Sequence, residues 1–211
     1  MYLAKIRTYR YNQIYLIIPP EVFHPGFFFS TKLLVSFISK MNLHEKSFLE
    51  LGAGSGLIAI YAAKKNAKVT AIDINPVAVK YLELNSSKNN VQLQIKESDI
   101  FSNVEKQQFD IIVINPPYYK NDPKTYKDYA WFCGKDGAYF RCLFESLDNY
   151  IHNASQVLMI LSEDCDLEMI SALAVKNNFT MDCIFRKKNI MEENMIFKIE
   201  QTHKAVGDNS F

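Results

Sequence analysis

Four consecutive residues, Asn115, Pro116, Pro117 and Tyr118, place hydrogen-bond acceptors on a stiff turn after an apolar run at 109–114. Neither proline carries a backbone N–H, so few neighbouring donors compete for the side-chain oxygen of Asn115 and the carbonyl oxygen of Pro116. Two adjacent acceptors suit the two hydrogens of a planar NH2 group, and the Tyr118 ring can lie flat against that plane. The motif predicts a rim that binds a planar amide or amine nitrogen; the alternative is an ordinary Asn-Pro turn.

A glycine-rich loop lies upstream, where Gly52, Gly54 and Gly56 separate a strand-like run from a helix-like run. Alternating glycines let the backbone adopt positive φ and let a ligand approach the main chain closely. This pattern indicates a nucleotide-like cofactor. The spacing is G-x-G-x-G, whereas the dinucleotide fingerprint is G-x-G-x-x-G, so a nicotinamide-dependent oxidoreductase is the poorer match. A strand-to-helix turn that uses glycine without a ligand is the structural alternative.

Two carboxylates follow the next two strand-like runs. Asp73, with Ile74 beside it, ends the run at 68–73, where its two oxygens can accept from both hydroxyls of a ribose. Asp99 follows the run at 91–96 and can accept from an adenine amino group while Ile100 packs on the ring. For Asp99 a solvated turn or a helix cap is an equally open interpretation.

The expected strands and helices alternate as a doubly wound α/β sheet requires. A hairpin at 3–19 and a helix at 31–41 come first, and the core strands are expected at 47–52, 68–73, 91–96, 109–114 and 156–161, with closing strands at 179–186 and 194–200. Helices are expected at 56–65, 76–89, 138–152 and 166–177. In such sheets ligands bind at the carboxyl ends of the parallel strands. Gly52, Asp73, Asp99 and Asn115 all fall there, so the sequence predicts one shared site.

Together with Glu50, these motifs resemble those of the class I S-adenosylmethionine-dependent methyltransferases, and within them the release-factor glutamine methyltransferases, the HemK-like family. The resemblance implies a Rossmann-like fold with a mostly parallel, seven-stranded, doubly wound sheet and a small N-terminal β hairpin and helix. It implies S-adenosyl-L-methionine as cofactor and S-adenosyl-L-homocysteine as product. It also implies that Glu50 orients the glycine loop or the cofactor's amine.

The site residues that the resemblance implies fall into three groups. Cofactor contacts are expected from Thr31, Glu50, Gly52, Gly54, Gly56, Asp73, Ile74, Asp99, Ile100 and Asn115. Catalytic roles are expected from Asn115, Pro116 and Tyr118, and substrate contacts from the same three residues and Pro117. No metal is expected.

Two further stretches support the resemblance, although each departs from the family pattern. Residues 131–137 resemble a Gly-Gly-x-Asp-Gly loop, with Cys133 in place of the first glycine. Residues 23–31 resemble the proline-rich entry segment, with Lys32 where the bacterial enzymes usually carry an acid. Only 46 residues precede the first core strand, so the chain resembles the short, single-domain branch, whose relatives can depend on a small partner subunit.

The domain division follows from this comparison. We expect an extension at 1–46, the methyltransferase domain at 47–201 and a tail at 202–211.

The implied reaction is methyl transfer to a planar NH2 nitrogen, and two substrate classes stay open. One is a glutamine side-chain amide in a release factor or another protein of translation. The other is an adenine or guanine amine in RNA or DNA, because the same rim occurs in nucleic-acid methyltransferases. A net charge of +1 favours the protein substrate, whereas Lys120, Lys124 and Lys127 beside the rim keep nucleic acid open. A Rossmann-like module that has lost its chemistry is a non-enzymatic alternative.

Composition agrees with a compact enzyme. The chain has 211 residues, of which 48% are hydrophobic, enough for one sizeable core. Its four cysteines show no metal-ligand spacing and are typical of reduced thiols in the cytoplasm. No apolar run approaches the ~20 residues of a membrane span, so no membrane association is expected.

Overall fold

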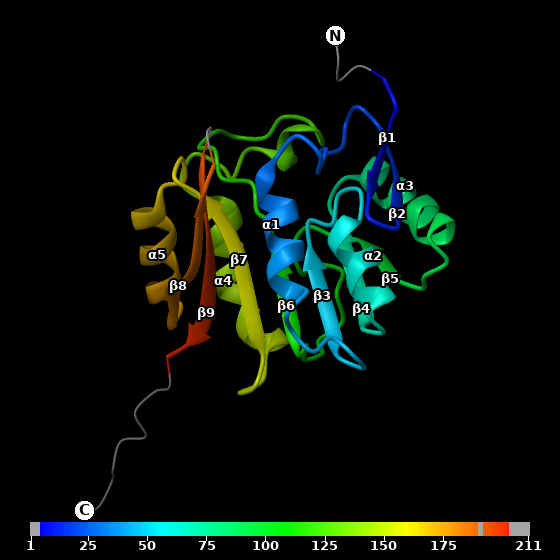
Figure 1. The fold of residues 1–211 in the computed structure, drawn as a ribbon. Helices are drawn as coiled ribbons and strands as arrows, with labels where there is room; N and C mark the ends of the chain where they lie inside the picture. Colours follow the sequence, from blue (N-terminus) through cyan, green and yellow to red (C-terminus); the bar gives the residue numbers. More distant parts are fainter. Residues whose placement is uncertain (1–4, 190–191, 203–211) are drawn as a thin grey trace, which may run out of the picture.

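The structure, a computed structural model, describes residues 5–189 and 192–202 and centres on a seven-stranded sheet (Figure 1). The strand order is β5-β4-β3-β6-β7-β9-β8, and β9 runs antiparallel to both of its neighbours. The strands are β3 (Ser47–Leu51), β4 (Lys68–Asp73), β5 (Gln94–Glu97), β6 (Ile111–Ile114), β7 (Gln156–Ser162), β8 (Phe179–Lys188) and β9 (Glu193–Gln201). The predicted α/β class and doubly wound sheet are therefore confirmed.

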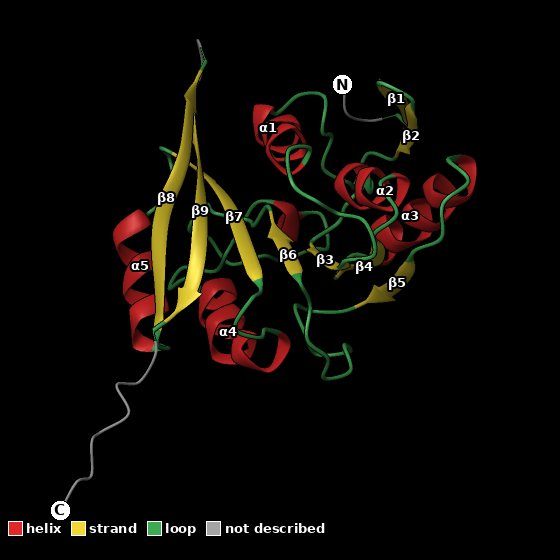
Figure 2. Cartoon of the chain, turned by 60° about the horizontal axis from the view of Figure 1, so that its bottom comes forward, coloured by secondary structure: helices red, strands yellow, loops and turns green. Residues whose placement is uncertain are grey.

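Helices cover both faces of the sheet, as Figure 2 shows. The helices α1 (Phe29–Ile38), α2 (Leu57–Lys64) and α3 (Pro76–Lys88) lie on one face, and α4 (Ala138–Leu147) and α5 (Leu167–Lys176) lie on the other. Two short 3-10 helices flank α4: η2 (Asp128–Ala130) precedes it and η3 (Asp148–Tyr150) follows it. None of the described helices is both long and apolar enough to cross a membrane.

Two hydrophobic clusters separate the layers, because successive residues of each buried strand point to opposite faces. In β3, Phe48 joins the cluster beneath α1 and α2, whereas Leu49 and Leu51 join the cluster beneath α4. In β6, Val113 joins the cluster beneath α1 and α2, and Ile114 joins the cluster beneath α4. Helices cover both faces of these two strands, which is why hydrophobic residues follow one another along them instead of alternating with polar residues.

The order of the strands reverses beside β3. From β3 the chain moves outward to β4 and β5, and then returns across β3 to β6 and β7. The connections leave β3 and β6 on opposite faces, so a crevice opens at their carboxyl ends. The glycine loop follows β3 and Asn115 follows β6, which places the two strongest sequence motifs on either side of this crevice.

Some predicted boundaries were wrong. The strand expected at 91–96 is β5 (Gln94–Glu97), because the backbone N–H of Val91 still closes the end of α3 by donating to Ser86 O at 3.1 Å. The helix expected at 138–152 ends at Leu147, where η3 takes over. The helix expected to begin at 31 begins at Phe29, so that Thr31 lies in its first turn.

Two asparagines, one in the last turns of α3 and one at its C-cap, dock the N-terminal hairpin of β1 (Arg7–Tyr11) and β2 (Ile14–Ile18). Asn85 accepts from Ile17 N at 2.8 Å and donates to Ile17 O at 3.0 Å. Asn89 makes the same pair of bonds to Tyr15, at 3.0 and 2.7 Å. Each side-chain amide thus satisfies a strand residue as a neighbouring strand would, which fixes the hairpin and the segment after it.

The hairpin and α1 share one hydrophobic cluster with β3 and β4, since Ile14, Leu16 and Leu34 pack with Phe48 and Val69. The division into an extension at 1–46 and a domain at 47–201 stays a prediction. Residues 3–4 of the expected hairpin and 203–211 of the expected tail lie outside the described residues.

We expect Asn85→Ala to lower the free energy of unfolding by about 2 kcal/mol, because it leaves part-buried backbone groups of Ile17 and the buried carbonyl of Ser55 without the partner that Asn85 supplies. Urea unfolding followed by circular dichroism measures the change. Ser87→Ala, at an exposed position of the same helix, is the control and should unfold like the wild-type chain. An Asn85→Ala midpoint equal to that of the control would contradict the docking role.

Candidate active site

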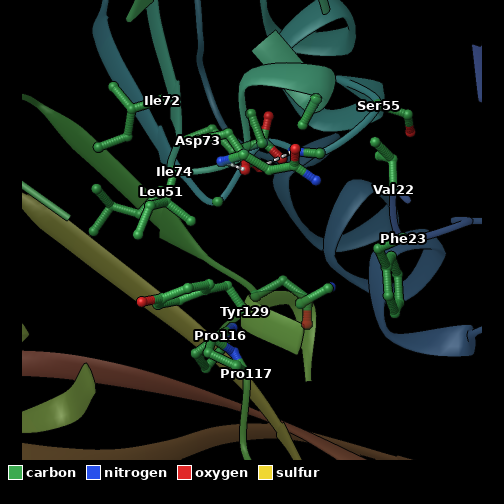
Figure 3. Close-up of a pocket in the computed structure, with 18 of the residues that line it drawn as sticks. Val22, Phe23, Leu51, Ser55, Ile72, Asp73, Ile74, Pro116, Pro117 and Tyr129 are labelled. Atoms are coloured by element: carbon green, nitrogen blue, oxygen red, sulfur yellow. Dashed lines mark hydrogen bonds between the residues drawn. The ribbon is translucent and has the colours of Figure 1, made fainter. Parts of the chain in front are cut away.

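A cavity opens at the carboxyl ends of the central strands, where the reversal of strand order predicts one. In Figure 3, Asp73 and Ile74 lie on one side of it, Pro116 and Pro117 lie opposite, and Phe23 forms a third wall. Of the residues predicted from the sequence, the lining contains Thr31, Glu50, Gly52, Gly54, Asp73, Ile74, Asp99, Ile100, Asn115, Pro116, Pro117 and Tyr118. The fold therefore brings them together from distant parts of the chain.

Gly56 is the one predicted cofactor contact that does not line the cavity. It precedes α2 with φ of +85°, and a Cβ there would collide with the Leu82 side chain of α3. Gly52, by contrast, has φ of +71° and nothing within 4 Å of where a Cβ would lie. Gly52 thus leaves open space for a ligand, whereas Gly56 permits the start of α2 to pack closely against α3; a cofactor contact at Gly56 stays a prediction.

Asp73 holds the glycine loop in place. Its Oδ2 accepts from the backbone N–H of Gly54 at 2.7 Å and its Oδ1 from that of Asn75 at 2.9 Å. Burial raises the pKa of Asp73, and these two hydrogen bonds oppose that rise. Each oxygen keeps a second lone pair, so the carboxylate can shape the loop and also accept from a diol in the cavity.

Glu50 is a buried carboxyl at the same end of the sheet. Its Oε2 accepts at 2.7 Å from the N–H of Ala59, in the first turn of α2, whose N-cap Gly56 offers no side chain. Burial raises the pKa of Glu50 well above its usual range, and the nearby charge of Asp73 adds to the rise. Glu50 therefore connects β3 to the helix after the glycine loop, which fits an orienting role.

The rim residues Asn115 and Pro116 both line the cavity, and each carries an oxygen that can accept a hydrogen bond. Asn115 Nδ2 donates to Thr31 Oγ1 at 3.3 Å and faces Ser30 Oγ at 3.5 Å, so its Oδ1 is turned away from these hydroxyls. No donor among the described residues bonds Asn115 Oδ1 or the Pro116 carbonyl oxygen. Burial raises the pKa of the Tyr118 phenol, which therefore stays neutral. The arrangement can accept both hydrogens of an NH2 group.

The charged side chains of the lining are all acidic: Glu21, Glu50, Asp73 and Asp99. Among the described residues, no lysine, arginine or histidine lines the cavity. A pyrophosphate would meet repulsion there, whereas a ligand with a sulfonium and an ammonium group would be attracted. The donor and acceptor set, the acidic field and the open space at Gly52 fit S-adenosylmethionine and argue against a dinucleotide.

Comparison with known proteins agrees with this geometry. Residues 15–132 match the model of the methyltransferase small domain family. The chain belongs to this family. It is an S-adenosylmethionine-dependent methyltransferase, which confirms the fold, cofactor and enzyme class that the motifs predicted.

Two relatives and one solved structure show how far the methyltransferase resembles known proteins. It is 40% identical over 71% of its length to a protein of Methanocaldococcus jannaschii named as a protein N5-glutamine methyltransferase, of which it covers 76%. It is 29% identical over 96% of its length to ribosomal RNA small subunit methyltransferase C of Buchnera aphidicola, of which it covers 56%. Mtq2 in its complex with Trm112 from E. cuniculi superposes with a TM-score of 0.65 at 18% identity, covering 86% of this chain and 99% of that one.

Sequence reasoning missed several residues that build the methyltransferase site. Asn75 caps α3 by accepting from Val77 N and donates through Nδ2 to Glu21 O at 3.1 Å, which ties the entry segment to the cavity. The signal was present, because an Asn before Pro76 is a helix-start pattern. Ser30 gave no such signal, since its contact with Asn115 joins residues far apart in the chain.

The loop at 131–137 supports the rim in the methyltransferase. Tyr119 N donates to Trp131 O at 2.9 Å, and Cys133 N donates to Tyr119 O at 3.0 Å. Phe28 contacts both Phe23 and Trp131, with ring centroids 4.6 and 5.1 Å apart. The family-like loop, the rim and the entry segment therefore form one connected wall.

We expect Glu50→Gln to gain stability relative to the wild-type chain as pH rises. A carboxyl whose pKa is raised by folding stabilises the fold below its unfolded pKa, about 4.5, and loses that contribution as pH rises through the folded value. Glutamine keeps an acceptor for Ala59 N and carries no charge to bury. Urea unfolding from pH 4 to pH 8 measures the difference.

Glu83→Gln, at an exposed position, is the matched control and should follow the wild-type curve. If the Glu50→Gln difference did not grow above pH 4.5, the assignment of a buried, readily neutralised Glu50 would be wrong.

Proposed function

We propose that the methyltransferase transfers a methyl group to the side-chain amide nitrogen of a glutamine in a protein of the translation apparatus, with release factors as the first candidates. The observation that carries the proposal is the pair of acceptors without donors, Asn115 Oδ1 and the Pro116 carbonyl, in the lining of an acidic cavity. The Methanocaldococcus relative, named as a protein N5-glutamine methyltransferase, supports the same substrate.

The rim residues act on a weak nucleophile, because the lone pair of an amide nitrogen is delocalised into its carbonyl. When bound, the cofactor supplies a methyl group activated by a positive sulfur. Asn115 Oδ1 and Pro116 O accept the two amide hydrogens, favour a pyramidal nitrogen and stabilise the positive charge that develops on it. The Tyr118 ring packs against the amide plane and excludes water. The methylated nitrogen then loses one proton to solvent, and no side-chain base is required.

The remaining predicted residues would hold the cofactor. We assign the ribose hydroxyls to Asp73, the adenine amino group and ring to Asp99 and Ile100, and the methionine part to the glycine loop and Thr31. Ile74 would pack beside the ribose. Glu50 acts through α2 and the loop, since its described hydrogen bond goes to Ala59 N.

Exposed aromatic side chains surround the mouth of the cavity and would meet the substrate. Tyr119, Tyr126 and Tyr129 are 41%, 51% and 36% exposed, although all three belong to the lining. Two of the lysines in this region are paired, Lys120 with Asp166 and Lys135 with Asp122. Of the lysines predicted beside the rim, Lys120 is one of these two, and a paired lysine adds little to phosphate binding, which favours a protein segment over a nucleic-acid backbone at the mouth.

A nucleobase amine in RNA is the second candidate, because the Buchnera relative named as a ribosomal RNA methyltransferase matches 96% of the chain. An activating subunit is also proposed, on the precedent of the Mtq2-Trm112 complex. A cytoplasmic location stays a prediction; all four cysteines are free thiols.

The substrate class can be tested by incubating the enzyme with methyl-labelled cofactor and a cell lysate, with and without added candidate subunit. Label that survives nuclease but not protease, and that mass spectrometry assigns to N5-methylglutamine, is expected. Label released by nuclease instead would replace glutamine by a nucleobase amine. The Asn115→Ala enzyme is the matched control for unspecific labelling.

We expect Asn115→Ala to reduce kcat by about a hundredfold or more, because one of two preorganised acceptors is lost. Calorimetry should give an S-adenosylhomocysteine affinity within about threefold of wild type, since the glycine loop and Asp73 are unchanged. A variant that kept most of its turnover would contradict the rim mechanism.

A further inference from the structure

We infer that Ser30 and Thr31 are positioning residues that turn the Asn115 side-chain amide so that its oxygen, and not its nitrogen, meets the substrate. The inference deepens the proposed function and rests on it. Both residues lie in the first turn of α1, and both line the cavity. Ser30 has no other role in the proposed mechanism.

The orientation of Asn115 decides whether the rim can work. An asparagine amide carries an acceptor and a donor on a nearly symmetrical fork, and a half turn about the last side-chain bond exchanges them. In the wrong orientation, the Asn115 NH2 would face the NH2 of the substrate, donor against donor. A third group must therefore select the productive orientation.

The two hydroxyls are placed to make that selection. Asn115 Nδ2 lies 3.3 Å from Thr31 Oγ1 and 3.5 Å from Ser30 Oγ, so both hydroxyl oxygens are within hydrogen-bonding distance of the amide nitrogen. Ser30 and Thr31 are only 9% and 6% exposed, so water competes little for them. A hydroxyl accepts while its own hydrogen points elsewhere, and here the open direction is the cavity that both residues line.

A role in capping α1 does not account for these hydroxyls. The N-cap of α1 is Phe28, and no side-chain hydrogen bond caps this helix. Instead, Phe28 packs against Trp131 with ring centroids 5.1 Å apart, which joins the start of α1 to the loop that supports the rim. The first turn of α1 is thus fixed relative to Asn115 by contacts that do not involve its hydroxyls.

The test uses the double variant Ser30→Ala/Thr31→Val, in which valine keeps the shape of threonine and neither residue retains an acceptor. Thr31→Ser is the conservative partner, and Ser36→Ala, at an exposed position of α1, is the control. In 15N-labelled enzyme, the Asn115 side-chain NH2 signal is assigned by its disappearance in Asn115→Asp. We expect its hydrogens to exchange with water at least about tenfold faster in the double variant, and to be unchanged in Thr31→Ser and Ser36→Ala.

Steady-state kinetics at saturating cofactor give the second readout. We expect kcat to fall by about tenfold or more in the double variant, the KM for the glutamine substrate to change less than kcat, and Thr31→Ser, which keeps the hydroxyl, to restore most of kcat. Unchanged exchange of the Asn115 NH2 group would overturn the inference, as would a rise in KM at constant kcat.

The two proposals fail differently. If the wild-type enzyme transfers no methyl group to glutamine, the proposed function is lost, and the exchange of the Asn115 NH2 hydrogens still decides whether Ser30 and Thr31 hold that amide.

Discussion

Two carboxylates at the carboxyl ends of β3 and β4, the buried Glu50 and the partly exposed Asp73, define the cofactor side of the site. Asp73 accepts from the N–H of Gly54, and Glu50 accepts from the N–H of Ala59, so both ends of the glycine loop are tied to the sheet. Burying two acids close together is costly, and the raised pKa values of both residues express that cost. The fold keeps them because backbone N–H groups at a helix start and in a loop need acceptors that a glycine cannot supply.

At the rim, hydrogen bonds between neutral groups hold the geometry, as the carboxylates do at the glycine loop. The two prolines remove backbone donors, so the acceptors of residues 115 and 116 stay available, and the partners that orient Asn115 come from α1. The loop at 131–134 closes the other side through Tyr119. Three segments, of which α1 is far from the other two in sequence, thus determine one hydrogen-bonding geometry. This explains why a short motif on a single loop can provide a rigid site.

The features of the fold and site that could be predicted from the sequence are those that depend on a local sequence pattern. The seven strands, the N-terminal hairpin, the cluster of Gly52, Asp73, Asp99 and Asn115 and the methyltransferase class all followed from periodicity, glycine spacing and motif resemblance. It failed where tertiary contacts decide. Gly56 has the same spacing as its neighbours, yet only the approach of Leu82 shows that it serves packing. The contacts of Ser30 and Asn75 join segments more than 50 residues apart, for which no local pattern exists.

The acidic lining also bears on how the enzyme distinguishes cofactor from product. S-adenosylmethionine carries a positive sulfur that S-adenosylhomocysteine lacks, and the other ionisable groups of the two molecules are the same. A cavity with Glu21, Glu50, Asp73 and Asp99 in its lining attracts that extra charge. When no cation is near, the raised pKa values of Glu50 and Asp73 make these two carboxyls easier to protonate, which reduces the negative charge of the cavity. A positive ligand reverses this effect, because it favours ionised carboxyls. Transfer of the methyl group removes the positive charge, so the same four acids that favour the cofactor hold the product less strongly.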